Sequence, residues 1–242
     1  MSGHSKWNNI KQKKGKTDAQ RAKVFTKISR EIIVAVKEGG GDPSANSKLK
    51  DVIAKAKAAN VPNDNIKRVI DRAAGGGENI VYEQNTYEGY GPSGVAVIVE
   101  TMTDNRNRTA SEMRHYFDKY GGNMGQEGCV SWSFDRKGVI IIDNEDEKRD
   151  EDTVMMDALE AGADDFQPGD EIFEVYTSPD TFGQVRGAME EKGYSFLSAQ
   201  LEMVPQNGMK LDAEEDRTKM EKLLTMLEDN DDVQNVWHNW EL

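Results

Sequence analysis

The first thirty residues carry the side chains with the clearest binding chemistry, a dense set of cations around a tryptophan. Nine lysines and arginines there face one acid, Asp18. Ammonium and guanidinium groups bind phosphate oxygens, and an indole beside them can stack on an unpaired base. The alternative role for Trp7 is to pin this segment to the helices that follow. The residues expected to contact nucleic acid here are Lys6, Trp7, Lys11, Lys13, Lys14, Lys16, Lys23, Lys27 and Arg30.

A second basic segment lies at the start of a predicted helix. Its sequence is Asp104-Asn105-Arg106-Asn107-Arg108-Thr109. Two arginines in a first helical turn oppose the helix dipole, which favours acids at that end. Arg106 and Arg108 could therefore hold an anion together with free backbone N–H groups. The alternative is that Glu112 and neighbouring acids neutralise them.

The residue patterns of common enzymes and metal sites are missing from the sequence. Gly91-Pro92-Ser93-Gly94 has Val95 where a nucleophile elbow requires glycine. The three histidines are widely spaced, and the acidic run at 143–152 lacks the spacing and central glycine of an EF-hand. We therefore expect a non-enzymatic protein with no cofactor, no metal and no small-molecule substrate.

Charge divides the chain into two bodies of opposite sign. The first seventy-two residues hold 17 Lys and Arg against 7 Asp and Glu, whereas the remaining 170 hold 14 against 37. A net charge of −13 therefore hides a basic end that suits an anionic partner. The acidic remainder would be repelled by extended duplex and could meet basic proteins.

Composition places the chain among soluble globular proteins, with 36% hydrophobic and 31% charged residues. Its apolar runs are too short or too interrupted for a secretory signal or a membrane span. The single cysteine, Cys129, excludes an internal disulfide and suits a reducing compartment. We expect a cytoplasmic protein without a membrane partner.

Two triple-glycine runs, at 39–41 and 75–77, enclose a helical pattern. Helices are predicted at about 19–38, 43–59 and 63–74, opened by Asp18, Asp42 and Asn63. In the first, the apolar residues fall on one side and Lys23, Lys27 and Arg30 near the opposite side. We therefore predict a basic helical domain at residues 1–76.

After Gly77 the pattern alternates between strands and helices. Strands are predicted at 95–99, 129–134 and 139–142, with a helix at 105–120. Further helices are predicted at about 152–161, 181–192 and 213–228, and strands at 171–177, 195–204 and 233–240. If Phe166 starts a short strand, residues 138–204 supply a complete β-α-β-β-α-β set.

These elements predict an α+β protein, a helical bundle followed by two ferredoxin-like α/β sandwich domains. One sandwich, at 137–205, is inserted in the other, which is formed by 77–136 plus 206–242. A sequential split near residue 137 is the alternative.

Four segments of the chain closely resemble the YebC/PmpR family, and the match runs essentially end to end. They are Gly3-His4-Ser5-Lys6-Trp7-Asn8-Asn9-Ile10, Ala56-Lys57-Ala58-Ala59-Asn60-Val61-Pro62, Thr103-Asp104-Asn105-Arg106-Asn107-Arg108-Thr109 and Gly121-Gly122-Asn123-Met124-Gly125. The resemblance implies a cytoplasmic protein with a helical N-terminal domain and two α/β domains. It implies either DNA-binding regulation of transcription or action on translating ribosomes, and one mitochondrial relative is a translational activator. The opening Gly3-His4-Ser5 resembles the branch described as transcriptional.

Two functional hypotheses use the same basic surface. The first is a DNA-binding transcriptional regulator. The second is a ribosome-associated translation factor that binds ribosomal RNA, with basic ribosomal proteins as further partners. A third hypothesis, of another class, is a protein adaptor that works through its acidic domains. The predicted helices present no set of Asn, Gln and Arg aimed at base edges, so we expect phosphate contact without strong base reading.

Overall fold

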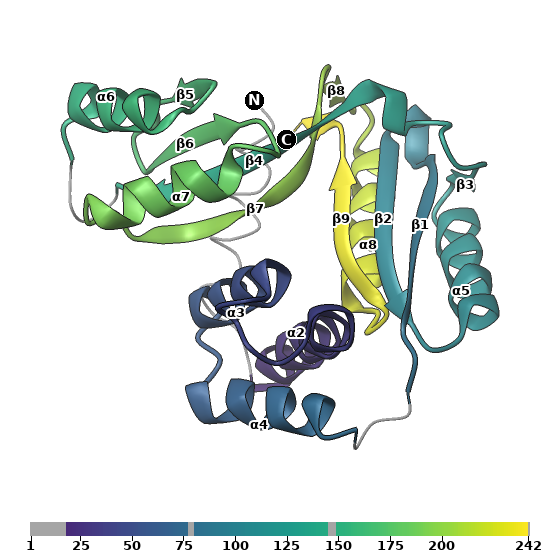
Figure 1. The fold of residues 1–242 in the computed structure, drawn as a ribbon. Helices are drawn as coiled ribbons and strands as arrows, with labels where there is room; N and C mark the ends of the chain where they lie inside the picture. The colour runs from purple at the N-terminus through teal and green to yellow at the C-terminus, as the bar shows by residue number, and fades with distance from the viewer. Residues whose placement is uncertain (1–17, 77–79, 145–148, 242) are drawn as a thin grey trace. The chain divides into compact units, whose positions relative to one another are not determined.

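The structure is a computed structural model that describes residues 18–76, 80–144 and 149–241. Helices and antiparallel sheets share the chain, which confirms the predicted α+β class (Figure 1). The chain forms two compact units, one of residues 1–134 with 205–242 and one of residues 135–204. The predicted domain boundaries at residues 76, 136 and 205 stay a prediction. In the described ranges no helix combines the length and apolarity needed to cross a membrane.

Three helices enclose the first apolar core. They are α2 (Asp18–Gly39), α3 (Ser47–Ala58) and α4 (Asn63–Ala74). Ile32 of α2 and Leu49 of α3 are completely buried, and Ile66 and Val69 of α4 belong to the same cluster. Full burial of one aliphatic side chain contributes roughly 1.5–3 kcal/mol, so the bundle has a stabilising core of its own.

Helix α3 begins later than the sequence pattern predicts. Asp42, expected to open it, accepts hydrogen bonds from the N–H and hydroxyl of Ser44 in a preceding turn. The cap is Asn46, whose Oδ1 accepts from the Leu49 N–H at 3.0 Å. Asn46 Nδ2 also donates to the carbonyls of Ala35 and Gly40, each at 2.8 Å. Because one buried amide joins the end of α2 to the start of α3, a tertiary contact decides where α3 begins.

A four-stranded antiparallel sheet with two helices forms the second core. Its strands are β1 (Glu83–Tyr90), β2 (Ala96–Thr103), β3 (Asn123–Met124) and β9 (Val233–His238), in the order β3-β1-β2-β9. Helices α5 (Arg106–Lys119) and α8 (Glu214–Asp229) bury Phe117 and Leu223 against Val97 and Val99 of β2. Alternate residues of a strand share a face, so both helices cover the same face of the sheet.

Two short strands and two 3-10 turns complete this unit. Strand β8 (Met209–Lys210) pairs in parallel with β10 (Trp240–Glu241). The turns are η2 (Pro92–Gly94) and η3 (Ser131–Ser133).

The predicted strand at 129–134 is wrong, because η3 occupies most of it and β4 begins at Phe134. The side chain of Glu88 on β1 supplies the physical reason. Its buried carboxylate accepts from the N–H groups of Gly128, Val130 and Ser131, each at 2.9 Å. These N–H groups are therefore not available for a strand ladder. Strand β1 itself was not predicted, since its sequence EQNTYEGY has no apolar alternation.

The unit at residues 135–204 contains the third core and a complete β-α-β-β-α-β set. Its elements are β4 (Phe134–Asp143), α6 (Glu151–Ala161), β5 (Asp165–Gln167), β6 (Ile172–Thr177), α7 (Phe182–Glu191) and β7 (Phe196–Pro205). The strand order β5-β6-β4-β7 is that of a ferredoxin-like sandwich, with Ile140, Val175, Val185 and Met189 in its core.

Candidate nucleic-acid interface

The residues predicted to bind nucleic acid fall partly outside the described ranges. Six of them lie in residues 1–17 and are not described, so their role stays a prediction: Lys6, Trp7, Lys11, Lys13, Lys14 and Lys16. The structure describes the other five, which are Lys23, Lys27 and Arg30 on α2 and Arg106 and Arg108 at the start of α5.

Lys23, Lys27 and Arg30 of α2 contact an acidic turn at residues 228–232, which comprises the end of α8 and the residues just after it. Lys23 Nζ lies 2.9 Å from Asp229 Oδ1, and Lys27 Nζ donates to the Glu228 carbonyl at 2.7 Å. Cations are favoured beside the last carbonyls of a helix, where the dipole is negative. The basic face of α2 is thus occupied by the protein's own acidic turn.

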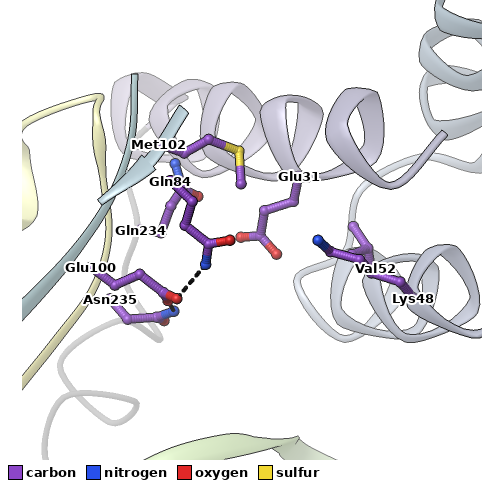
Figure 2. Close-up of a pocket in the computed structure, with 8 residues that line it drawn as sticks. All are labelled: Glu31, Lys48, Val52, Gln84, Glu100, Met102, Gln234 and Asn235. Carbon is purple, nitrogen blue, oxygen red and sulfur yellow. Dashed lines mark hydrogen bonds between the residues drawn. The ribbon is translucent and has the colours of Figure 1, made fainter. Parts of the chain in front are cut away.

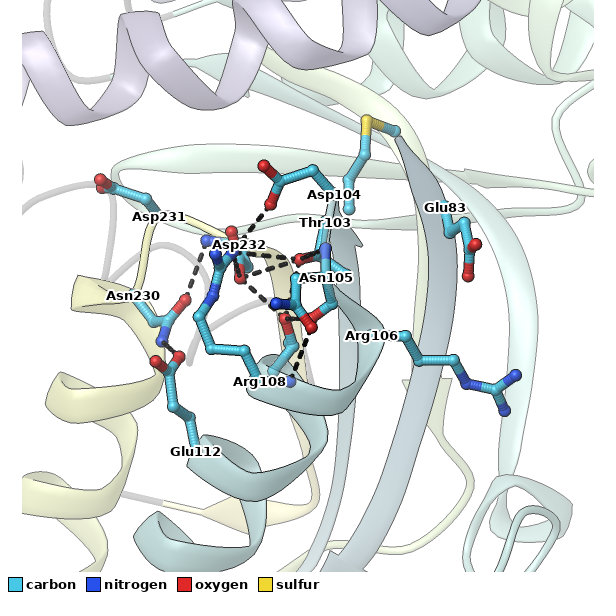
Figure 3. A network of polar contacts seen from close by, with 12 residues as sticks. Glu83, Thr103, Asp104, Asn105, Arg106, Arg108, Glu112, Asn230, Asp231 and Asp232 are labelled. Atoms are coloured by element: carbon cyan, nitrogen blue, oxygen red, sulfur yellow. Dashed lines mark hydrogen bonds and ion pairs between the residues drawn. The ribbon is translucent and has the colours of Figure 1, made fainter. Parts of the chain in front are cut away.

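Asp232 is the centre of a network that joins α2, β2 and α5. Figure 3 shows the part of it that involves Thr103 and Arg108. Its carboxylate accepts from Arg30 Nη1 at 2.6 Å and from Arg108 Nη2 at 2.8 Å. The hydroxyl groups of Thr103 and Thr109 donate to it at 3.1 and 2.7 Å. Burial by itself would raise the pKa of Asp232, but these four donors lower it to about 2. Arg30 and Arg108 therefore hold a structural carboxylate.

The two arginines at the start of α5 have different surroundings. Arg108 forms a second ion pair with Asp104 at 3.0 Å, while Glu112, expected to neutralise the arginines, accepts from Asn230 Nδ2 instead. Arg106 is exposed, and Figure 3 shows its guanidinium directed away from the network. Within the described residues the Arg106 side chain has no ion pair, so it remains available to an anion.

Four further cations, on α3 and α4, are exposed and were missed as site residues by the sequence analysis. They are Lys50, Lys57, Lys67 and Arg68, and in the part of the chain that the structure describes no hydrogen bond or ion pair occupies their side chains. By contrast, Lys48 pairs with Glu38 and Lys55 with Glu31.

A usable signal for two of these cations was present in the sequence. Lys50 and Lys57 have no acid three or four residues away, where a helical partner would lie. They are also seven residues apart, about two helical turns, so they share one stripe of α3. The run of lysines before residue 30 is denser, so the sequence favours that segment as the binding site over α3.

The other unusual titratable groups do not assemble a catalytic set among the described residues. Burial and the nearby charge of Glu88 raise the pKa of the Cys129 thiol. Burial lowers the pKa of His238 to about 4. In the described ranges no group of three or more His, Cys, Asp and Glu side chains could hold a metal ion.

A basic three-helix bundle joined to two α/β sandwiches defines the class of this protein. Two family models match the chain. The TACO1/YebC protein N-terminal domain matches residues 5–76, and the TACO1/YebC second and third domain matches residues 82–240. The chain therefore belongs to the TACO1/YebC family, which confirms the resemblance found in its motifs.

Similar proteins span the whole chain. A protein of Acetivibrio thermocellus is 60% identical over 240 residues, 99% of each chain, and one of Caldicellulosiruptor saccharolyticus is 58% identical over 241 residues, 100% of this chain and 99% of its own. Each is named "Probable transcriptional regulatory protein". The crystal structure of a conserved hypothetical protein from Aquifex aeolicus is 46% identical, with a TM-score of 0.83 over 93% of this chain and 92% of that one.

Proposed function

We propose that this chain is a non-enzymatic regulator of gene expression that binds DNA through its N-terminal helical domain. The observation that carries the proposal is the set of exposed cations Lys50, Lys57, Lys67 and Arg68, which have no partner within the described residues. They lie in a segment with 17 Lys and Arg against 7 Asp and Glu. The names of the relatives support the same class, and the single cysteine supports action in the cytoplasm.

The proposed mechanism is electrostatic docking on phosphates. Lysine and arginine side chains that neutralise phosphates release condensed counterions, which drives association and makes it salt-dependent. The proposed contact surface joins the exposed cations of α3 and α4 to the basic segment before α2, with Trp7 as a stacking platform. Arg106 is proposed as a separate phosphate contact on the α/β body, because its guanidinium is exposed and unpaired among the described residues. We also propose that the chain divides into three domains, at residues 1–76, 77–136 plus 206–242, and 137–205.

A second candidate function is binding of ribosomal RNA on translating ribosomes through the same surface. The division of charge favours it. The residues after 72 carry 14 Lys and Arg against 37 Asp and Glu, and this net negative charge would repel extended duplex. The acidic domains would then be available to basic ribosomal proteins.

The direct test is reversal of charge on α3 and α4. We expect K50E/K57E/K67E/R68E to weaken binding to a short nucleic acid by at least about tenfold and to lower the salt slope by roughly three to four. Equilibrium titration by fluorescence anisotropy at several salt concentrations measures both.

The matched control is R114E/K119E/K210E/K222E, which changes the net charge equally at exposed positions of the α/β body. Equal losses in the two variants would contradict the proposed surface, because only total charge would then matter.

A further inference from the structure

A cavity of about 90 Å³, lined mostly by polar residues, lies between α2, α3 and the sheet of the first unit. Figure 2 shows its lining side chains, with Glu31 and Val52 on the helical side and Gln84, Glu100, Met102 and Gln234 on the sheet side. One water needs about 10–15 Å³ of such volume, so the space admits several waters or one edge of a planar ring.

Gln234 is the feature of this cavity that points to a ligand. Both side-chain polar atoms of Gln234, Nε2 and Oε1, are buried and have no hydrogen-bond partner among the described residues. Buried polar groups are nearly always paired, because an unpaired one costs about 1–3 kcal/mol. A donor and an acceptor on one amide are therefore held ready for a partner that offers both.

The backbone of β9 places Gln234 in the wall of the cavity, with its amide buried there. In the pairing of β2 with β9, Glu100 is opposite Asn235 and Thr101 is opposite Val233, so Gln234 is the extra residue of a bulge. Neighbouring residues of a regular strand point to opposite faces, but here Gln234 and Asn235 both line the same cavity. Bulges often re-aim a side chain in this way beside a functional site.

The remaining polar groups define the chemistry of the partner. Glu100 accepts from Gln84 Nε2 at 2.5 Å and from Asn235 Nδ2 at 2.7 Å, and Glu31 accepts from Lys55. Each carboxylate oxygen has two acceptor positions, so these groups can take further donors. Lys48 also lines the cavity, but its ammonium pairs with Glu38, so the two carboxylates still disfavour a phosphate. An arginine or lysine would satisfy them but has no acceptor for Gln234 Nε2.

We propose that this cavity binds the amino-bearing edge of one unpaired nucleobase. Adenine is the model ligand, because a glutamine amide can bond its N6 amino group and N7 together. Met102 and Val52 supply apolar contact for the ring. This inference rests on the proposed function, to which it adds a base-reading element beside the phosphate-binding cations.

The test compares single strands of about twelve nucleotides, a length within the range of single-strand binding sites. The strands carry deoxyadenosine, thymidine or abasic sites on the same number of phosphates, and the intact chain is titrated with each by fluorescence anisotropy. We expect the adenine strand to bind about tenfold more tightly than the other two. We expect Gln234→Leu to remove this preference while keeping the salt slope, and Gln126→Leu, the same change at an exposed loop position, to keep the preference.

Thermal unfolding verifies that both variants fold. Gln234→Leu removes a buried unpaired amide, so its midpoint should equal or exceed that of the natural chain. Equal affinity of the natural chain for all three strands, or a preference that survives Gln234→Leu, would overturn the inference and leave salt-dependent binding intact. No salt-dependent binding of any strand would instead overturn the proposed function, and the inference with it.

Discussion

At the scale of single residues, Asp232 shows that a buried carboxylate can form ion pairs with cations for which the sequence suggests no partner. Its side chain is only 5% exposed and is surrounded by Arg30, Arg108, Thr103 and Thr109. A buried carboxylate is stable only when its lone pairs are taken, and here two guanidinium groups and two hydroxyl groups take them. Residues 123 to 202 positions apart in the chain thus depend on one another, which no local pattern reveals.

We predict that Asp232→Asn lowers the free energy of unfolding by about 3 kcal/mol at neutral pH, since it leaves two arginines without their shared partner. The pKa of Asp232 falls from an ordinary 3.8 to about 2, a shift that corresponds to about 2 kcal/mol. A lowered pKa stabilises the folded state above the unfolded value, so this contribution is lost as pH falls from about 4 toward 2. Urea unfolding at several pH values measures both effects.

Asp231→Asn is the matched control for this substitution. Asp231 is exposed, and its hydrogen bond to Arg30 uses the backbone carbonyl, which asparagine retains. We expect a change within about 0.5 kcal/mol. A loss as large as that of Asp232→Asn would show that the network does not depend on the carboxylate.

At the scale of elements, Glu88 determines the conformation of the segment between β3 and β4. Three backbone N–H groups of this segment donate to the buried carboxylate of Glu88. The same segment presents Trp132, 72% exposed, whose indole N–H donates to the Cys129 carbonyl at 2.9 Å. A single acid on β1 therefore orders a loop that alternation alone would describe as a strand.

We predict that Glu88→Gln destabilises the protein by about 2 kcal/mol, because an amide can replace only one of the two acceptor oxygens and brings an N–H₂ group toward the loop amides. Hydrogen exchange should increase at Gly128, Val130 and Ser131 before it increases elsewhere. Burial by itself would raise the pKa of Glu88, but the loop N–H groups lower it. Its contribution is therefore present above the ordinary pKa of 4.5 and lost on acidification below it.

Glu83→Gln is the control on the same strand, because Glu83 is exposed. Unchanged exchange at the loop amides in Glu88→Gln would contradict the assigned role.

At the scale of the whole molecule, opposite charges are divided between the helical domain and the rest of the chain. Lys23, Lys27 and Arg30 of α2 contact the acidic remainder, whereas Lys50 and Lys57 of α3 and Lys67 and Arg68 of α4 stay exposed. A nucleic acid would therefore meet a small basic surface attached to a strongly acidic body. Long-range repulsion from that body should limit binding to sites that the helical domain reaches alone.

We predict that crosslinking in cells recovers the intact chain with DNA fragments, and that it stays apart from ribosomes on sucrose gradients at low and high salt. If phosphate contacts drive binding, crosslinking of the variant K50E/K57E/K67E/R68E should no longer recover DNA fragments. Co-migration with ribosomes together with crosslinks to ribosomal RNA would contradict the DNA proposal and support the second candidate. The control variant R114E/K119E/K210E/K222E should behave as the natural chain.

The sequence by itself determined the α+β class, the helical bundle with its buried Ile32, and the ferredoxin-like set that ends at β7, because these follow from local periodicity of apolar residues. It also determined the family, whose motifs are long and specific. Periodicity could not reveal β1, which has few apolar residues and takes its place by pairing with β2 and β3. Nor could it reveal the later start of α3, which the buried Asn46 amide decides.

Only the tertiary structure decided which cations are available. Sequence pattern treats Lys23, Lys27, Arg30 and Arg108 alike, as positive charges on helices. Lys23 pairs with Asp229, and Arg30 and Arg108 pair with Asp232, acids that lie far away in the chain at the end of α8 and just after it. Electrostatic pairing depends on distance in space rather than on separation in sequence. The same reason applies to the cavity at Gln234, since a bulge in β9 and two distant helices must meet before an unpaired amide is enclosed.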